Sequence, residues 1–189
     1  MDSTKPQKSS ARKTPPATGV AARRKRKRAG ERRTDIREQL WPGSEAEIWN
    51  RLQNHGFCTI PRLLPLICAL IKQLSKSGDA SSVYLDLWSR AFDEGYVAIR
   101  HEDECAFSSG YSGPRATRTW TERMELLEEL GFIRCKSAGI RRFAHVLIVN
   151  PLLVIAHLRS KGKPRVPDEW WAAYIVRADE IGAELPPVE

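Results

Sequence analysis

Two arginines and two threonines lie close together in the first half of a predicted long helix: Arg115, Thr117, Arg118 and Thr121. A guanidinium group can donate two hydrogen bonds to guanine, and a threonine hydroxyl can bond to bases. Acidic residues follow on the same side of the helix, at Glu122, Glu125, Glu128 and Glu129. This order opposes the helix dipole, which favours the reverse by ~0.3–1 kcal/mol per charge. We therefore predict that the first half faces DNA; the alternative is a solvated face whose charges pair with neighbouring elements.

Four more basic residues lie in a predicted β-hairpin after this helix: Arg134, Lys136, Arg141 and Arg142. The last two lie near the turn, and the first two lie across from them. Basic residues on such a hairpin commonly contact the sugar-phosphate backbone, which adds affinity without sequence information. An edge strand protected by its charges is the alternative.

The N-terminal segment is centred on a basic run: Arg23, Arg24, Lys25, Arg26, Lys27 and Arg28. Residues 1–38 contain thirteen lysines and arginines against four acidic residues, a net charge of +9. The remaining residues contain eighteen and nineteen, a net charge of −1, so the basic excess belongs to this segment. We predict that residues 1–34 form a disordered arm that binds nucleic acid through counterion release. A solubilising tail, a nuclear-import signal and an RNA-binding arm are the alternatives.

The long helix has recognisable ends and one apolar side. Ser112 and Pro114 are suited to its beginning, and Gly131 is suited to its end. Helical spacing predicts that one stripe meets the core: Ala116, Trp120, Met124, Leu127 and Leu130. Arg123 falls within this stripe, so we predict a packed stem and a guanidinium paired with an acid, and we leave it out of the DNA-contact set.

Shorter elements surround this helix. Residues 102–107 are predicted to form a helix with Ala106 and Phe107 turned inward, and residues 96–99 a short strand that pairs with the hairpin. The hairpin itself is predicted from residues 132–136 and 143–149, which are separated by small residues.

Further helices are predicted on both sides. A capping box at Ser44 and Glu47 predicts a helix that ends near Gly56 and buries Ile48, Trp49 and Leu52. A second helix starts at Pro61 and a third spans residues 80–92, and we interpret Trp49 and Trp88 as core anchors. Residues 151–158 and 168–182 are predicted to form the last two helices. The final helix either makes a dimer contact or folds back onto the chain's own core.

The sequence offers no pattern for catalysis or for a bound metal. None of the cysteines and histidines has the paired spacing of a metal site: Cys58, Cys68, Cys105, Cys135, His55, His101, His145 and His157. There is no glycine-rich phosphate loop and no nucleophile motif. No secretory signal and no membrane-spanning run is present. We therefore expect no enzyme, no cofactor, no membrane partner and no small-molecule substrate.

The residues from Trp120 to Ile133 are WTERMELLEELGFI. This run resembles the ending of the recognition helix, with its glycine and immediate strand, in bacterial winged helix-turn-helix DNA-binding proteins, and the match extends over residues 101–150. A basic arm with one small winged domain is also similar to proteins of plasmids and integrating elements. Winged domains serve for protein contact as well, so the resemblance is more specific for fold than for function.

We therefore predict a mainly α fold with a small antiparallel β-hairpin (α+β), that is, a winged helix-turn-helix with extra N- and C-terminal helices. The domains are the basic arm (1–34), the winged domain with its N-terminal helices (35–160), and a basic linker with a C-terminal helix (161–189). The resemblance implies a sequence-specific binder of double-stranded DNA, a transcriptional regulator in a bacterial cytoplasm, associated with nucleoid or plasmid and open to homodimer formation. The alternatives are a plasmid replication or maintenance factor, and a protein-interaction module in which only the arm binds nucleic acid.

Overall fold

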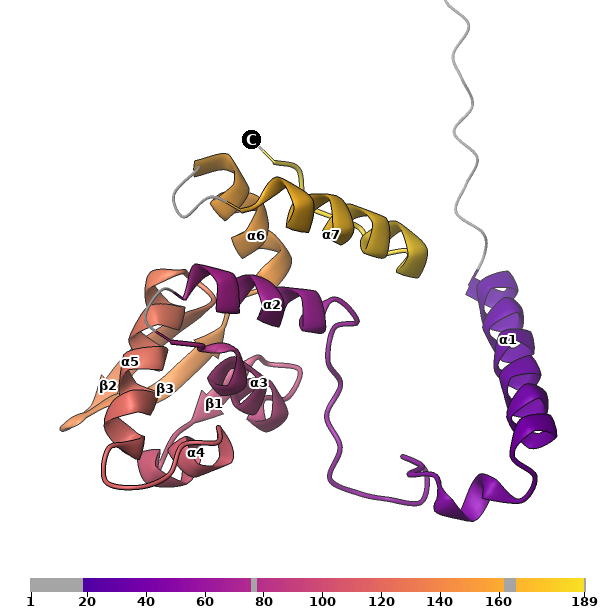
Figure 1. The fold of residues 1–189 in the computed structure, drawn as a ribbon, viewed down its shortest axis with the longest axis horizontal. Coiled ribbons are helices and arrows are strands. Elements are labelled where there is room, and N and C mark those ends of the chain that lie inside the picture. The colour runs from indigo at the N-terminus through magenta and orange to yellow at the C-terminus, as the bar shows by residue number, and fades with distance from the viewer. Residues whose placement is uncertain (1–18, 76–77, 162–165, 189) are drawn as a thin grey trace, which may run out of the picture. The chain divides into compact units, whose positions relative to one another are not determined.

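The structure is a computed structural model that describes residues 19–75, 78–161 and 166–188. The chain divides into two compact units, Met1–His55 and Gly56–Glu189 (Figure 1). Each unit is described by itself.

The first unit contains the helix α1 (Gly19–Leu40) and the short 3₁₀ helix η1 (Ser44–Glu47). Residues 19–34 thus lie in a helix, where the composition predicts a disordered arm. Alanine, arginine, lysine and glutamate dominate this stretch and are strong helix formers. Lys27 and Glu31 form an i,i+4 ion pair at 3.8 Å. Such a helix depends on propensity and local pairs, because its described side chains bury no apolar stripe.

The prediction of a helix from the capping box is wrong. The chain makes only one 3₁₀ turn at η1 and continues irregularly, and no side-chain capping bond forms there. The side chains expected in its core are exposed: Ile48, Trp49 and Leu52. A capping motif adds only a local stabilisation, and a short helix in water needs tertiary packing to persist.

The second unit is mainly helical with one small antiparallel sheet, an α+β arrangement. Its elements are α2 (Leu64–Leu74), α3 (Ser81–Arg90), β1 (Tyr96–Ala98), α4 (Glu102–Ser108), α5 (Ala116–Glu129), β2 (Ile133–Ala138), β3 (Arg141–Ile148), α6 (Pro151–Lys161) and α7 (Asp168–Ile181). The strands lie in the order β1-β3-β2, so the predicted strand before α4 does pair with the hairpin. Its register places Val97 opposite Val146.

The core lies between α5, the helices α2 and α3, and the inner face of the sheet (Figure 1). Trp120 is fully buried, and its ring meets the ring of Phe143 edge-on at 5.8 Å between centroids. Tyr84 of α3 makes a similar contact with Phe132 at 5.4 Å. Aromatic pairs of this geometry contribute beyond the area they bury, so α5, α3 and the hairpin are fixed to one another.

The last helix folds back onto its own chain. Trp170, Tyr174 and Ala178 of α7 are buried, and the indole nitrogen of Trp170 donates to the carbonyl oxygen of Leu66 at 2.9 Å. This is one of the two arrangements predicted for α7. The face with Ile175 and Val176 remains exposed.

Two smaller predictions need correction. The side chain of Phe107, predicted to turn inward, is 75% exposed. The long helix begins at Ala116 with no side-chain cap, so Ser112 does not cap it. Trp88 packs against the core and is edge-on to Tyr84, as a core anchor should, but it is only half-buried and also lines a pocket. Among the described residues, no helix has the length and apolar character needed to cross a membrane.

Candidate nucleic-acid interface

The turn between α4 and α5 is held by Tyr111. Its backbone nitrogen donates to the carbonyl oxygen of Ala106 at 2.9 Å, which closes the end of α4. Its hydroxyl donates to the carbonyl oxygen of Asp79 at 3.0 Å and lies 3.4 Å from the hydroxyl of Ser82. The turn is therefore anchored to the segment that begins α3, and this anchor sets where α5 starts.

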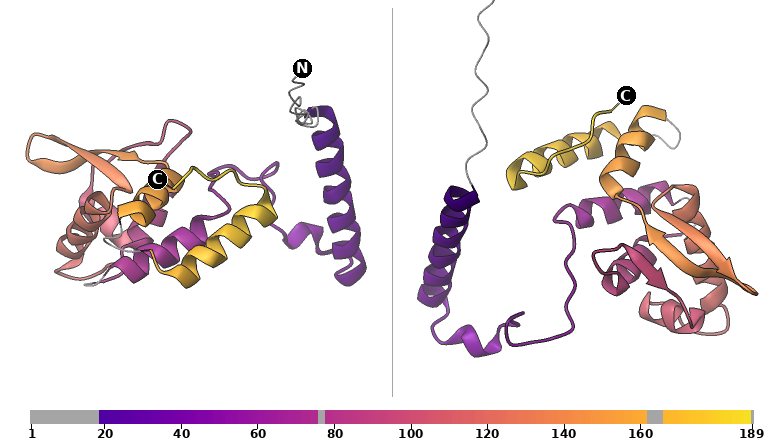
Figure 2. Two further views of the ribbon diagram at one scale, coloured as in Figure 1. Left: turned by 90° about the horizontal axis from the view of Figure 1, so that it is seen from above. Right: turned by 180° about the vertical axis from the view of Figure 1, so that it is seen from behind.

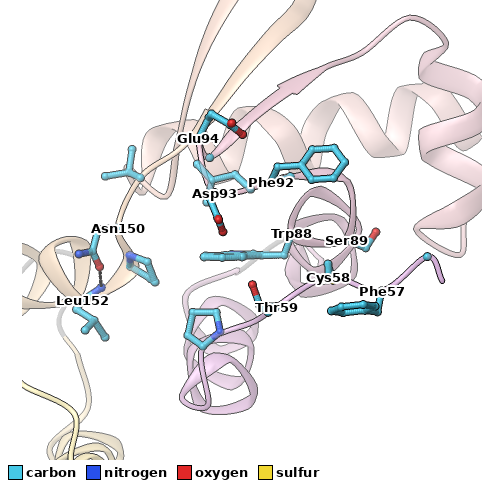
Figure 3. Close-up of a pocket in the computed structure, with 17 residues that line it drawn as sticks. Phe57, Cys58, Thr59, Trp88, Ser89, Phe92, Asp93, Glu94, Asn150 and Leu152 are labelled. Carbon is cyan, nitrogen blue, oxygen red and sulfur yellow. Dashed lines mark hydrogen bonds between the residues drawn. The ribbon is translucent and has the colours of Figure 1, made fainter. Parts of the chain in front are cut away.

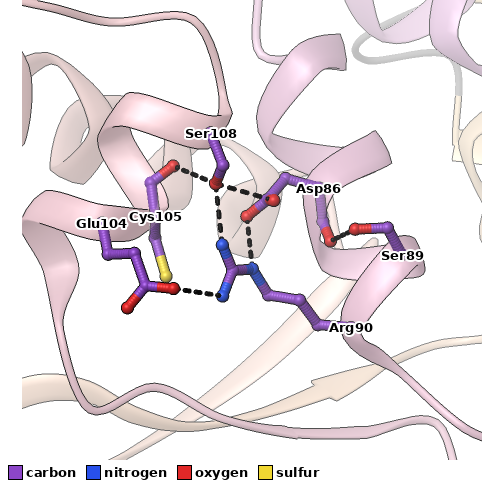
Figure 4. Close-up of polar contacts among 6 residues, drawn as sticks. All are labelled: Asp86, Ser89, Arg90, Glu104, Cys105 and Ser108. Carbon is purple, nitrogen blue, oxygen red and sulfur yellow. Dashed lines mark hydrogen bonds and ion pairs between the residues drawn. The ribbon is translucent and has the colours of Figure 1, made fainter. Parts of the chain in front are cut away.

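A polar cluster joins α3 to α4 (Figure 4). The Arg90 guanidinium donates to the Asp86 carboxylate at 2.8 Å and to the Ser108 hydroxyl at 2.7 Å. Ser108 in turn donates to the other Asp86 oxygen at 2.8 Å, and Glu104 lies 3.8 Å from Arg90. The Asp86 side chain is nearly buried, and its bonds to Arg90 and Ser108 link α3 to the end of α4.

The inner side of α5 matches the predicted stripe. Trp120, Met124, Leu127 and Leu130 are buried, and Ala116 is partly buried. Gly131 has a φ of 85°, the left-handed conformation that ends a helix at little cost only for glycine. Arg123 is 12% exposed and lies 3.9 Å from the Glu122 carboxylate, as its packed position within the stripe predicts.

The outer side of α5 begins with exposed arginines. Arg115 is exposed, and the Arg118 side chain is 81% exposed while pairing with Glu122 at 3.2 Å. Thr117 and Thr121 are half-buried, so their hydroxyls lie at the edge of this surface. The first half of α5 therefore offers two guanidinium groups to solvent from a helix that the core holds rigidly on its other side.

The acidic second half of α5 has a structural partner. Arg142 of β3 forms ion pairs with Glu125 and Glu128, and its guanidinium lies over the Phe143 ring at 5.0 Å. Glu128 also accepts a hydrogen bond from the backbone nitrogen of Cys135 at 2.9 Å. These carboxylates tie the hairpin to α5, so the alternative of charges pairing with a neighbouring element holds for this half of the helix.

The basic residues of the hairpin do not share one surface. Arg134 and Lys136 are exposed on the sheet face opposite α5, since they alternate with Ile133 and Cys135, which point inward. Arg141 donates to the carbonyl oxygen of Ile99 at 3.1 Å, beside the loop that leads into α4. Arg142, as described above, is held by α5.

The basic run of the first unit lies within α1. Arg24, Lys27 and Arg28 are exposed there. The side chains of Arg23, Lys25 and Arg26 lie outside the described part of the chain, as do residues 1–18 of the predicted arm and residues 162–165 of the predicted linker. A helix with exposed lysines and arginines presents a dense positive charge that attracts phosphates at low salt.

The four cysteines form no disulfide, and no cluster of histidine, cysteine and acidic side chains suited to a metal is found among the described residues. Burial raises the pKa of the Cys105 thiol to about 11. Burial, together with the Glu128 carboxylate, raises the pKa of Cys135 to about 12. Both groups therefore favour the neutral thiol, which is a weaker nucleophile than the thiolate.

One pocket in the second unit is lined by none of the residues predicted to contact DNA (Figure 3). It has a volume of about 960 Å³, and its lining includes Phe57, Trp88, Phe92, Asp93, Glu94 and Asn150. The Asn150 side chain accepts from the backbone nitrogen of Leu152 at 3.0 Å and so caps α6, ahead of Pro151 in the first turn. Sequence reasoning singled out none of these six residues except Trp88, because they come from three segments that are far apart in the chain.

Sequence reasoning also gave no role to Ile140. It follows Gly139 in the hairpin turn and is fully exposed. The sequence does hold one signal, which is an isoleucine at a turn position, because turns favour glycine, asparagine, aspartate, serine and proline.

Comparisons with models of protein families, with curated proteins and with solved structures find no match to this chain.

Proposed function

We propose that this protein binds double-stranded DNA in a sequence-specific manner and acts as a transcriptional regulator. The observation that carries the proposal is the exposed pair Arg115 and Arg118 at the start of α5, on a helix fixed from behind by Trp120. The order α3, β1, α4, α5, β2, β3 is the order of a winged helix-turn-helix, in which α5 takes the place of the recognition helix.

In this proposal the first half of α5 enters the major groove. Arg115 and Arg118 donate to guanine edges, and each well-formed bidentate contact contributes about 1–3 kcal/mol of discrimination. Thr117 and Thr121 contact bases or phosphates at the border of the helix. The Arg118–Glu122 pair costs little to break, because exposed ion pairs contribute only about 0–1 kcal/mol.

Phosphate contacts supply the rest of the affinity. Arg134 and Lys136 contact phosphates from the sheet face opposite α5, and the basic run of α1 adds a contribution that does not depend on sequence. We propose a bacterial cytoplasm, where nucleoid or plasmid DNA is available, as the location of this function. The same interface would equally serve a plasmid replication or maintenance factor.

A protein-interaction module is the second candidate function, and the pocket favours it. Phe57, Trp88 and Phe92 give this surface three aromatic rings beside the carboxylates of Asp93 and Glu94. Aromatic side chains with adjacent acids suit a basic peptide better than they suit a nucleic acid. In this candidate only the basic run of α1 would touch DNA.

Selection of duplexes from a random pool, with the full chain and with a chain lacking residues 1–34, tests the proposal. We expect both chains to recover the same motif. The shortened chain should bind random duplex more weakly and with a shallower salt dependence, by roughly 0.9 in log–log slope for each phosphate that it no longer neutralises. No motif from either chain, with binding abolished by the deletion, would favour the protein-interaction module.

We further propose that α2 and α7 form a homodimer contact that pairs two DNA half-sites. A shallow groove of about 440 Å³ lies between these helices, with the apolar residues Pro65, Leu66, Ala173 and Val176 beside Arg62, Arg177 and Glu180. A surface with both charge signs can be self-complementary about a two-fold axis, with Glu180 of one copy facing an arginine of the other.

Replacing Val176 by aspartate should shift the protein to monomers, because it places a charge in the centre of this contact. Sedimentation equilibrium measures the change. Leu153→Asp is the matched control, since Leu153 is an exposed apolar residue of α6 outside the groove. A wild-type chain that is monomeric at all concentrations, or equal dissociation of both variants, would exclude this contact.

A further inference from the structure

The tip of the β2–β3 hairpin presents a bare isoleucine. β2 ends at Ala138 and β3 begins at Arg141, so Gly139 and Ile140 alone form the turn. Gly139 has a φ of 60°, whereas no described residue other than glycine has a positive φ. This is the pattern of a tight type II′ hairpin turn, which aims its second residue outward. The exposed fraction of Ile140 is 103%, so none of its side chain is covered.

The hairpin is fixed along its length, so Ile140 is held in place rather than carried on a loose loop. Arg142, two residues after it, is tied to Glu125 and Glu128 of α5. Arg141 is bonded to the carbonyl oxygen of Ile99. From these anchors the ribbon projects beyond the helices of its unit (Figure 2).

The charge around the tip indicates a polyanionic partner. The stretch from Ile133 to Ile148 contains four basic residues and no acidic residue. Arg134 and Lys136 are exposed on it, and Arg141 uses one donor internally, which leaves the others for phosphate oxygens. An apolar tip between basic strands is therefore matched to a groove of duplex DNA, whose walls are phosphates and whose floor is stacked bases.

We propose that Ile140 inserts as a wedge between two base pairs from the minor groove and kinks the duplex next to the site read by α5. Isoleucine is among the side chains that serve as such wedges, and partial unstacking bends DNA toward the major groove. This inference rests on the proposed function. It adds a second activity to it, deformation of the bound DNA, together with a preference for flexible pyrimidine–purine steps beside the motif.

The test uses the full chain and a duplex recovered from the pool selection. One form of the duplex carries 2-aminopurine at successive positions, and another carries a donor and an acceptor dye at its ends. With the wild-type protein, we expect 2-aminopurine fluorescence to rise at one step and energy transfer between the ends to increase. Ile140→Asn should abolish both signals and keep the sequence preference, because asparagine suits the turn but cannot act as an apolar wedge. Ile140→Leu should retain both signals.

The outcomes separate this inference from the proposed function. Specific binding of the wild type without either signal, or equal signals from wild type and Ile140→Asn, would overturn the wedge and leave base reading by α5 intact. A wild-type protein that shows no sequence-specific binding would overturn both the wedge and the proposed function. Vesicles containing phosphatidylserine are the second probe: binding that depends on Ile140, in the absence of DNA deformation, would assign the tip to a lipid surface and also overturn the wedge.

Discussion

Replacing Arg115 and Arg118 together by alanine should lower the affinity for the selected duplex by about 2–6 kcal/mol, since each bidentate contact with guanine contributes about 1–3 kcal/mol. The affinity for random duplex should fall much less, because phosphate contacts elsewhere remain. Fluorescence anisotropy titrations measure the affinities for the selected and the random duplex. They use the chain lacking residues 1–34 and one fixed salt concentration. Stability should change little, because both side chains are exposed.

Lys72→Ala is the matched control for this double variant. Lys72 is also an exposed helical cation in an ion pair, at 4.0 Å from Asp79, but it lies on α2 and does not line the groove between α2 and α7. It should leave the affinities for selected and random duplex unchanged. A double variant that loses equal affinity for both duplexes would show that Arg115 and Arg118 contact phosphates without reading bases.

Replacing Trp120 by alanine should lower the free energy of unfolding of the second unit by about 3–5 kcal/mol. Trp120 is fully buried and joins α5 to the hairpin through the Phe143 ring. Its removal opens a cavity where the back of α5 is held, so specific DNA binding should weaken as well. Urea denaturation followed by circular dichroism measures the stability.

Trp120→Phe should cost clearly less than Trp120→Ala. The indole nitrogen of Trp120 is buried and has no hydrogen-bond partner among the described residues. Phenylalanine keeps most of the ring and removes this unpaired donor, which carries a desolvation cost of about 1–3 kcal/mol. Equal losses for the two variants would mean that the indole group makes an interaction that phenylalanine cannot replace.

The elements around α5 were predictable because their signals are local. The apolar stripe from Ala116 to Leu130 and the glycine at 131 define the helix and its end. The strand at residues 96–98 has alternating burial and pairs as expected. Each of these features depends on residue types within one or two turns of chain.

The predictions that were wrong depended on contacts between distant residues. The capping-box residues Ser44 and Glu47 are present in the sequence, but no side-chain capping bond forms, and nothing in that sequence indicates whether the unit supplies a surface that would bury Trp49. The orientation of Phe107 depends on how α4 is placed. That placement is set by the bond between Arg90 and Ser108, which are eighteen residues apart in the chain, so the predicted inward orientation was wrong.

The charged residues of the candidate interface also fall into two groups: those whose position follows from local spacing and those whose position depends on distant contacts. Helical spacing places Arg115 and Arg118 on an outer side, and there they lie. It cannot reveal that Arg142 reaches back to Glu125, seventeen residues earlier. The four basic residues of the hairpin look equivalent in the sequence, whereas the fold gives them three different environments.

The central claim is that the beginning of α5 reads guanine edges in the major groove. Replacing each guanine of the selected duplex by 7-deazaguanine removes the N7 acceptor at one position at a time. The chain lacking residues 1–34 should lose affinity at one or two of these positions, and the same chain with Arg118→Ala should become insensitive at one of them. Identical sensitivity of both chains at every guanine, or none in either, would contradict base reading by this helix.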